Sequence, residues 1–518
     1  MYAGNSFPRG RRPQGLKRCL SALVLIVAAC RTPAGDPVEP PQMSLAPPSL
    51  APSVSGLPAP DGASASPVPL QAPQASRWLP GDELFLAAPP GERRLLLLAN
   101  PSDQSGQFDV AVDPVGVQTT PAPLPSPGRS GGSRRAAPFG FGVAFDASLR
   151  SDGSLPGRRL FVAPTAAAAA WETFWINDGS ATLAGDRPCD TRLMLQTENA
   201  LFYVDEAAEA TLDKAALGRL AEAFERRIRP PLTRVFGQED RPGADGQPRL
   251  FIVLSPWVGQ ADGREGMMGY FWPRDPLAPS AEAADLTRHA NQKEVIFLAA
   301  RILEQPDVTA LGTLAHEYQH LLTFCAKTRL DGTPRPEALW LDEGLSMLAM
   351  DLAGFGRVGQ DPFVLDEVAA YMQNPAAYSL TDWAGNPEGR SYGLSYLFVR
   401  YLTGRFGLGI VAELQQTTRT GIAALDEVLA RRGTSTATVY VDWLKAGAQA
   451  LVSGEPGLGP VPLSLTEPTL YPVRPWGAVY LEAQAWPSEG RRATFSGTRT
   501  PLLYWRGIPG DPLGELGP

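Results

Sequence analysis

The chain has 518 residues, of which 44% are hydrophobic and 19% are charged, with 52 Gly and 52 Pro. These values are typical of a turn-rich, soluble globular protein with material for more than one domain. The net charge of −8 is spread along the chain without a basic stripe, which excludes nucleic acid as an expected partner.

The first 29 residues are expected to be a lipoprotein signal peptide. Basic residues precede the apolar run CLSALVLIVAAC, which is too short to span a bilayer and suits a secretory signal. Its end, VAAC, resembles the lipobox of bacterial lipoproteins, which implies acylation of Cys30. We therefore expect an exported protein, lipid-anchored in the cell envelope to a bacterial membrane, at the outer membrane or the cell surface. The alternative is a plain signal peptide cleaved near Ala29.

Two segments separate this signal from the main domain. Residues 30–76 are mainly Pro, Ala and Ser, which predicts a disordered tether because little apolar surface is there to bury. Residues 77–176 contain short apolar runs separated by turn residues, which predict an N-terminal β region. The sequence leaves open whether that region is a removable pro-segment or a permanent domain.

Residues 177–453 are expected to form one mixed α+β domain. Periodicity predicts an amphipathic helix over residues 212–228 and mainly helices in the second half. Residues 454–518 return to Pro-rich turns with short apolar runs, which predict a small C-terminal β region. Buried strands are expected within ALFYV (200–204), DGQPRLFIVLSP (245–256) and EVIFLAA (294–300).

The stretch TLAHEYQHLLTF, residues 313–324, contains two of the three histidines. On a helix, His316 and His320 lie one turn apart and roughly opposite an apolar stripe, so both imidazoles reach one ion. Glu317 suits the general base for a metal-activated water. The pattern predicts a zinc site, with solvated surface histidines as the alternative. The stripe consists of Leu311, Leu314, Ala315, Tyr318, Leu321, Leu322 and Cys325.

A catalytic zinc needs a third protein ligand and one open position. No histidine follows His320, and Cys325 lies on the apolar stripe. Glu343, in LWLDEGLSMLAM, is surrounded by large apolar residues, where a carboxylate without a partner would be costly. We therefore choose Glu343 as the third ligand. The alternatives are Asp342, Glu337 and His289.

The motifs HEYQH and DEGLS together resemble the gluzincins, zinc peptidases whose third ligand is a glutamate on a later helix. Over residues 170 to 450 the chain is similar to the hyicolysin-type neutral metallopeptidases of bacteria, as in GYFWPRDP and SYGLSYLFVRYLTGRFG. The resemblance implies a zincin-like domain with a mixed sheet and a helical lower half, and a peptide or protein substrate. It makes His316, His320 and Glu343 zinc ligands and Glu317 the general base.

The resemblance also raises two questions about supporting residues. Thermolysin-like members carry an aspartate four residues after the glutamate ligand, which orients a histidine; here Met347 takes that place, and Asp342 or Asp351 could serve instead. Tyr392 is our candidate, by analogy, for the donor to the oxyanion, and Tyr396 is its rival.

Two further predictions concern the folded part. In an oxidising compartment, Cys189 and Cys325 are expected to form a disulfide, with two buried thiols as the alternative. Asp245 and Asp275 lie in Gly- and Pro-rich turns and are weak candidates for Ca²⁺, since such residues usually belong to turns.

The leading functional hypothesis is a membrane-tethered, exported zinc endopeptidase. The main alternative is a surface lipoprotein that uses a peptidase-like fold for binding or adhesion. A third is a zinc hydrolase of another amide, such as cell-wall peptide. An intact Glu317 favours an enzyme, because a binding scaffold gains nothing from a general base.

Overall fold

The structure is a computed structural model of the chain. The predicted signal peptide, Cys30 and the tether lie outside the described residues. Across the part that is described, no helix is both long and apolar enough to cross a membrane. The described residues are 77–78, 83–86, 96–103, 106–113, 154–155, 158–159, 168–180, 182–261, 267–281, 284–452, 461–462, 469–482, 491–497 and 502–503.

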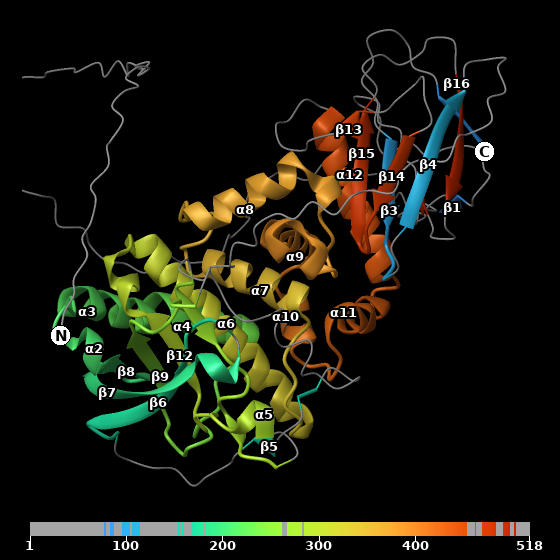
Figure 1. Cartoon of the computed structure of the whole chain (residues 1–518). Coiled ribbons are helices and arrows are strands. Elements are labelled where there is room, and N and C mark those ends of the chain that lie inside the picture. The colour runs from blue at the N-terminus through green and yellow to red at the C-terminus, as the bar shows by residue number, and fades with distance from the viewer. Residues whose placement is uncertain are drawn as a thin grey trace, which may run out of the picture. The chain divides into compact units, whose positions relative to one another are not determined.

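A six-stranded mixed sheet, in the order β10-β12-β9-β8-β7-β6, forms one layer of the main domain (Figure 1). The strands β8, β9 and β12 run parallel, and the other three are antiparallel to their neighbours. All residues of these parallel strands are buried, which is why they appear in the sequence as continuous apolar runs. The strands are β6 (Trp171–Asn177), β7 (Asp186–Gln196), β8 (Ala200–Asp205), β9 (Leu250–Ser255), β10 (Gly269–Phe271) and β12 (Val295–Ala299).

The amphipathic helix expected after the first of these runs is present and longer than predicted. It comprises α3 (Lys214–Ala223), a π-helical segment (Phe224–Ile228) and α4 (Arg229–Phe236). Asp213 caps its start, because its carboxylate accepts hydrogen bonds from the amides of Ala215 and Ala216. Two prolines at the start of α4 lack amide donors, which accounts for the interruption of the α-helical ladder there.

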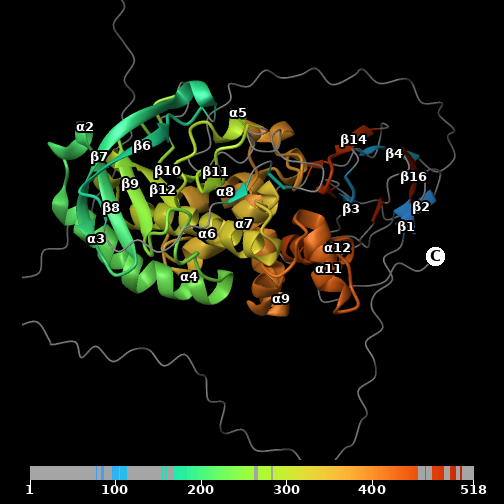
Figure 2. The ribbon, with the colours of Figure 1, turned by 90° about the horizontal axis from the view of Figure 1, so that it is seen from below.

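The second half of the domain is helical, as predicted, and α6 (Asp307–Asp331) lies between the sheet and α7. It packs against β10, β12, α4 and α7 (Figure 2). The helix ends at Gly332, whose left-handed φ of 78° suits glycine. The remaining helices are α7 (Leu339–Leu352), α8 (Pro362–Gln373), α9 (Tyr392–Phe406), α10 (Gly409–Leu414), α11 (Gly421–Ala430) and α12 (Thr436–Val452).

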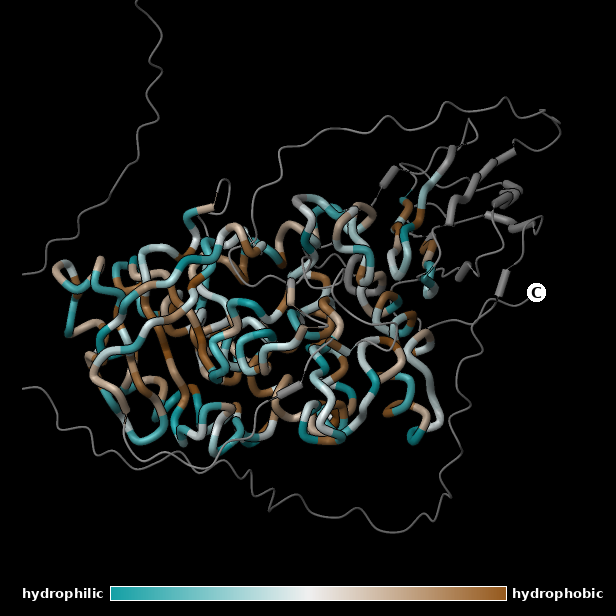
Figure 3. Tube along the Cα trace, turned by 60° about the horizontal axis from the view of Figure 1, so that its bottom comes forward, coloured by the Kyte–Doolittle hydropathy of each residue, from teal (hydrophilic) through white to brown (hydrophobic). Residues whose placement is uncertain are grey.

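Burial along α6 differs from the one-sided pattern expected. Every residue from Ala310 to Thr328 is buried, including those on the face that carries the histidines. Figure 3 shows hydrophobic stretches running through the interior, with hydrophilic stretches outside them. The histidines of α6 therefore lie in the protein interior, where polar groups must have partners.

The close approach of α9 to α7 depends on a glycine next to the predicted glutamate ligand. A Cβ atom on Gly344 would lie 2.8 Å from Val399 and 2.9 Å from the carbonyl oxygen of Ser395. Any larger residue would push α9 away from α7. Gly344, directly after Glu343, thus allows the first half of α9 to lie against α7.

The two predicted β regions are not separate. In each of three sheets, strands from before the main domain pair with strands from after it (Figure 1). These sheets contain β14-β4-β16-β2, β13-β15-β3 and β1-β17. The strands are β1 (Arg77–Trp78), β2 (Glu83–Leu86), β3 (Leu96–Asn100), β4 (Gly106–Asp113), β13 (Val461–Pro462), β14 (Thr469–Val473), β15 (Gly477–Glu482), β16 (Arg491–Gly497) and β17 (Leu502–Leu503).

This pairing corrects the predicted organisation in two places. Removal of residues 77–113 would leave the edges of β14, β15 and β16 without partners, so this region supports the C-terminal strands. In addition, β6 belongs to the six-stranded sheet, although the prediction placed it in the N-terminal β region.

Short elements complete the description: α2 (Glu206–Glu209), α5 (Ala284–Thr287), and β5 (Arg158–Arg159) paired with β11 (Leu277–Ala278). The expected mixed α+β class is confirmed.

Candidate metal centre

The structure brings His316, His320 and Glu343 together from two adjacent helices. One nitrogen of each imidazole and one carboxylate oxygen all lie within 4.8 Å of one another. Within the residues that the structure describes, no other set of three histidine, cysteine or acidic side chains comes this close. The Oε2 atom of Glu343 lies 3.0 Å from Nε2 of His316 and 3.6 Å from Nε2 of His320. These spacings suit ligands that share one ion at about 2.1 Å.

Glu317 lies beside these ligands and is fully buried. Its Oε2 accepts a hydrogen bond of 2.8 Å from the amide of Phe271, the last residue of the edge strand β10. Its Oε1 has no hydrogen-bond partner in the described part of the chain. Burial raises the pKa of Glu317 to about 8, against the opposing influence of His320. One oxygen is thus fixed by the sheet while the other is left for a proton.

The centre contains more buried negative charge than built-in positive charge. Among the described residues, no lysine or arginine forms an ion pair with Glu317, Asp342 or Glu343. Burial raises the pKa of Glu343, but interactions with His320 and His316 outweigh it and lower that pKa to about 2. Desolvation lowers the pKa of His320, but Asp342 and Glu343 outweigh it and raise that pKa well above its usual value. Histidines alone offset this charge, so the donor set fits a metal cation.

Of the two aspartates considered for orienting a histidine, only Asp342 contacts one. Its Oδ2 lies 2.9 Å from Nδ1 of His320. Asp351 instead accepts a hydrogen bond of 2.5 Å from the hydroxyl of Tyr396 and lies 3.7 Å from Arg400. Met347 is buried among apolar neighbours.

The structure also separates the two candidate tyrosines. Tyr392 is the first residue of α9, and its ring centroid lies 6.3 Å from that of His316. Burial, together with the nearby charge of Glu343, raises the pKa of Tyr392 well above its usual value, so the hydroxyl keeps its proton. The hydroxyl of Tyr396, one turn later, is bound to Asp351. Tyr392 is therefore the candidate that lies beside a predicted ligand.

The alternative ligand Glu337 and the two cysteines predicted to pair have other surroundings than the sequence indicated. Glu337 forms an ion pair of 3.0 Å with Lys327, and both side chains are fully buried. That lysine also donates to the backbone carbonyls of Leu414, at the end of α10, and of Thr417 and Arg419, which follow it, so the pair joins this part of the chain to α6. The predicted disulfide is wrong: Cys189 and Cys325 are two buried thiols that are not joined. Cysteine counting gives no information on distance, which is what a disulfide requires.

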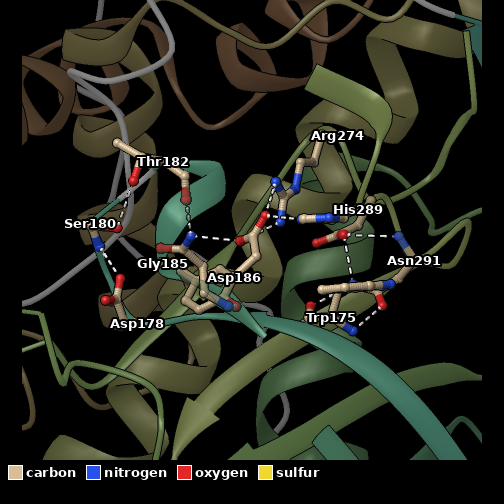
Figure 4. A network of polar contacts seen from close by, with 12 residues as sticks. Trp175, Asp178, Ser180, Thr182, Gly185, Asp186, Arg274, His289 and Asn291 are labelled. Atoms are coloured by element: carbon tan, nitrogen blue, oxygen red, sulfur yellow. Dashed lines mark hydrogen bonds and ion pairs between the residues drawn. The ribbon is translucent and has the colours of Figure 1, made fainter. Parts of the chain in front are cut away.

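His289 belongs to a different network, shown in Figure 4. Its Nδ1 lies 3.0 Å from Oδ2 of Asp186, and its ring stacks on Trp175 at 3.8 Å between centroids. Both terminal nitrogens of Arg274 bind the same carboxylate at 2.8 Å. The side chains of Asp186 and Arg274 are 0% and 1% exposed. This network was missed by the sequence analysis, and the arginine within GYFWPRDP was its only visible sign.

The two weak calcium candidates are held by neighbouring groups. Asp245 accepts a hydrogen bond of 2.9 Å from the amide of Gln247, within its own turn. Asp275 is buried and accepts hydrogen bonds from both the amide and the side chain of Asn291. Neither belongs to a set of metal-ligating side chains among the described residues. The structure offers no support for calcium at these two positions.

Comparison with known proteins gives one clear similarity. No family model matches the chain. A neutral metalloprotease, ShpI of Staphylococcus hyicus, is 26% identical over 223 residues, which are 40% of this chain and 47% of that protein. An M1 zinc metallopeptidase of Deinococcus radiodurans covers 53% of this chain and 52% of its own, at 16% identity and a TM-score of 0.28. The chain spans about half the length of the curated relative, and it is similar in sequence to a metalloprotease.

Proposed function

We propose that the chain is a zinc-dependent endopeptidase of the gluzincin type, similar to the hyicolysin-like peptidases, with a zincin-like domain. The observation that carries this proposal is the buried set of His316, His320 and Glu343, close enough to share one ion. The excess of negative charge around it supports the binding of a divalent cation. The similarity to a neutral metalloprotease supports hydrolysis of peptide bonds.

In this proposal His316, His320 and Glu343 hold the zinc ion. A bound zinc ion polarises a carbonyl group and lowers the pKa of water. Glu317 acts as general base: the amide of Phe271 fixes its Oε2, so Oε1 takes a proton from water and later gives it to the leaving amine. The hydroxyl of Tyr392 donates a hydrogen bond to the oxygen on which negative charge develops. Burial of these groups strengthens each interaction.

We also propose that the protein is exported and tethered to a membrane through acylated Cys30. This proposal is supported by the sequence alone, through the apolar run that ends in VAAC. Two or more acyl chains would hold the protein stably at a membrane surface. The substrate would then be peptides or proteins outside the cytoplasm.

Hydrolysis of casein tests the proposed activity, with zinc-loaded wild type and Glu317→Gln compared directly. We expect wild type to lose activity with a chelator and to regain it with zinc. The variant should bind one zinc ion per chain and have at least about 10³-fold lower kcat, since it keeps the ligands and loses the base. A wild type that binds zinc and cleaves neither casein nor other peptides would contradict the proposal and favour the binding scaffold.

A further inference from the structure

His320 has a different partner at each of its two ring nitrogens. Its Nδ1 lies 2.9 Å from Oδ2 of Asp342, and its Nε2 lies 3.6 Å from Oε2 of Glu343. His316 also faces Glu343 through Nε2, at 3.0 Å. Nε2 is therefore the nitrogen through which both histidines face the third ligand.

We propose that Asp342 is a positioning residue, which fixes His320 for metal binding by accepting a hydrogen bond from Nδ1. This inference depends on the zinc site proposed above. A neutral imidazole carries one proton, and a proton held on Nδ1 leaves the lone pair of Nε2 for the metal. The carboxylate also fixes the plane of the ring and makes the imidazole a stronger donor.

Further hydrogen bonds hold this part of α7 against α6. The hydroxyl of Ser346 lies 2.8 Å from the carbonyl oxygen of Asp342 and 2.5 Å from Oε1 of Gln319. The amide of Gln319 donates to the hydroxyl of Thr323 at 2.7 Å. This arrangement fixes Gln319, which precedes His320 on α6, against the turn of α7 that carries Asp342. The position of the carboxylate is thus set by both helices.

The other groups near His320 fit this role less well. The Ser346 hydroxyl lies 3.3 Å from Nδ1 and 3.2 Å from Nε2, so it is farther from Nδ1 than Asp342 is. Met347 has no group that accepts a strong hydrogen bond, and the carboxylate of Asp351 is bound to Tyr396. Asp342 precedes the predicted ligand Glu343 in the chain, so the segment DEGLS supplies both a ligand and its support.

Zinc affinity tests the proposal without any substrate. The metal-free full-length chain competes with a chromogenic chelator for zinc, as wild type, Asp342→Ala, Asp342→Asn and Asp351→Asn. We expect Asp342→Ala to weaken zinc binding by about 10- to 100-fold. Asp342→Asn should lose less, because its carbonyl still accepts the Nδ1 proton. Asp351→Asn is the matched control on the same helix and should bind zinc within about two-fold of wild type, whatever its stability.

The tautomer of His320 gives a second measurement, on wild type alone. The sequence contains three histidines, so protein labelled with ¹⁵N-histidine gives few ring signals. With zinc bound, His320 should carry its proton on Nδ1. A proton on Nε2 instead would overturn the proposal even if the alanine variant fails to fold.

The outcomes separate this inference from the proposed function. Zinc binding by Asp342→Ala within two-fold of wild type would end the inference and leave the peptidase standing. Weakened zinc binding in a protein that cleaves no peptide would support the inference and end the peptidase. A wild type that fails to bind zinc would end both.

Discussion

Glu343 and Asp186 are both carboxylates buried beside a histidine, but the charges around them differ. Asp186 is bound at 2.8 Å by both terminal nitrogens of Arg274, and His289 adds a third contact. Glu343 has two histidines and, among the described residues, no lysine or arginine. In the first region the chain supplies its own cation. In the second, the compensating charge must come from protons or from a metal.

A third carboxylate, Asp275, lies next to Arg274 in the chain and shows another way to bury an acid. Burial raises its pKa to about 7, although the charge of Arg274 and hydrogen bonds from Asn291 lower it in part. One buried acid is therefore neutralised by an arginine, one takes up a proton near neutral pH, and one faces two imidazoles. The arrangement without a built-in cation is the one expected at a metal site.

Glu343→Gln should have the largest effect, because it removes the buried carboxylate that we assign to the metal. We expect zinc affinity to fall by at least about 100-fold and peptidase activity to be lost, because an amide is a poor zinc ligand. Metal-free Glu343→Gln should also unfold at a lower temperature than metal-free wild type, because the lowered pKa of Glu343 means that the two histidines stabilise its charged form in the folded protein. Chelator competition and thermal unfolding check these two results. Wild-type zinc affinity in the variant would contradict the assignment.

Arg274→Met removes the built-in cation from the other region. We expect the free energy of unfolding to fall by about 3 to 5 kcal/mol, because Asp186 then stays buried without its main partner. Zinc affinity should be unchanged, since none of the proposed ligands contacts Arg274. Urea unfolding measures the loss. His289→Asn is the matched control, and we expect it to cost less than about 1 kcal/mol because that side chain is 19% exposed.

If Arg274→Met lowers the free energy of unfolding by less than about 1 kcal/mol, the arginine is not needed to compensate the buried charge of Asp186. The contrast between the two regions would then fail. Equal losses for Arg274→Met and His289→Asn would mean that the histidine, rather than the guanidinium, compensates Asp186.

The pH dependence of stability tests Asp275, the buried acid that takes up a proton near neutral pH. The folded pKa of Asp275 is about 7, against an ordinary value of 3.8, so the folded protein holds this proton more tightly than the unfolded chain. Its contribution to stability is complete at low pH and is lost as pH rises through about 7. The difference amounts to at most about 4 kcal/mol. Zinc-loaded wild type should therefore lose more stability between pH 5 and pH 8 than Asp275→Asn does, as measured by urea unfolding.

These tests concern features that differ in how far the sequence reveals them. The spacing of His316 and His320 is a local property of one helix, so periodicity places both on one face. Glu343 was found by elimination and by its apolar surroundings. The strands of the main sheet are continuous apolar runs, and their existence followed from local pattern.

The features that the sequence did not reveal depend on contacts between distant segments. Asp186 and Arg274 are 88 positions apart, and nothing near either residue identifies the other as its partner. The pairing of β4 with β16 brings together strands from the two ends of the described chain, whereas local pattern shows only that each is a strand. The choice between Asp342 and Asp351 required the side-chain positions on α7, because both residues lie near Glu343 in sequence.

The smallest expected effect compares two tyrosines that lie one turn apart on α9. Tyr392 is beside His316, whereas the hydroxyl of Tyr396 is bound to Asp351. If Tyr392 stabilises the developing oxyanion, Tyr392→Phe should lower kcat about 100-fold, equivalent to about 2.7 kcal/mol, with little change in KM. Tyr396→Phe should lower stability and leave kcat near that of wild type, since it leaves Asp351 short of a donor. Peptide hydrolysis measures both variants. Equal losses in kcat and in substrate affinity for Tyr392→Phe would remove it from this role, because a donor to the oxyanion acts mainly on the transition state.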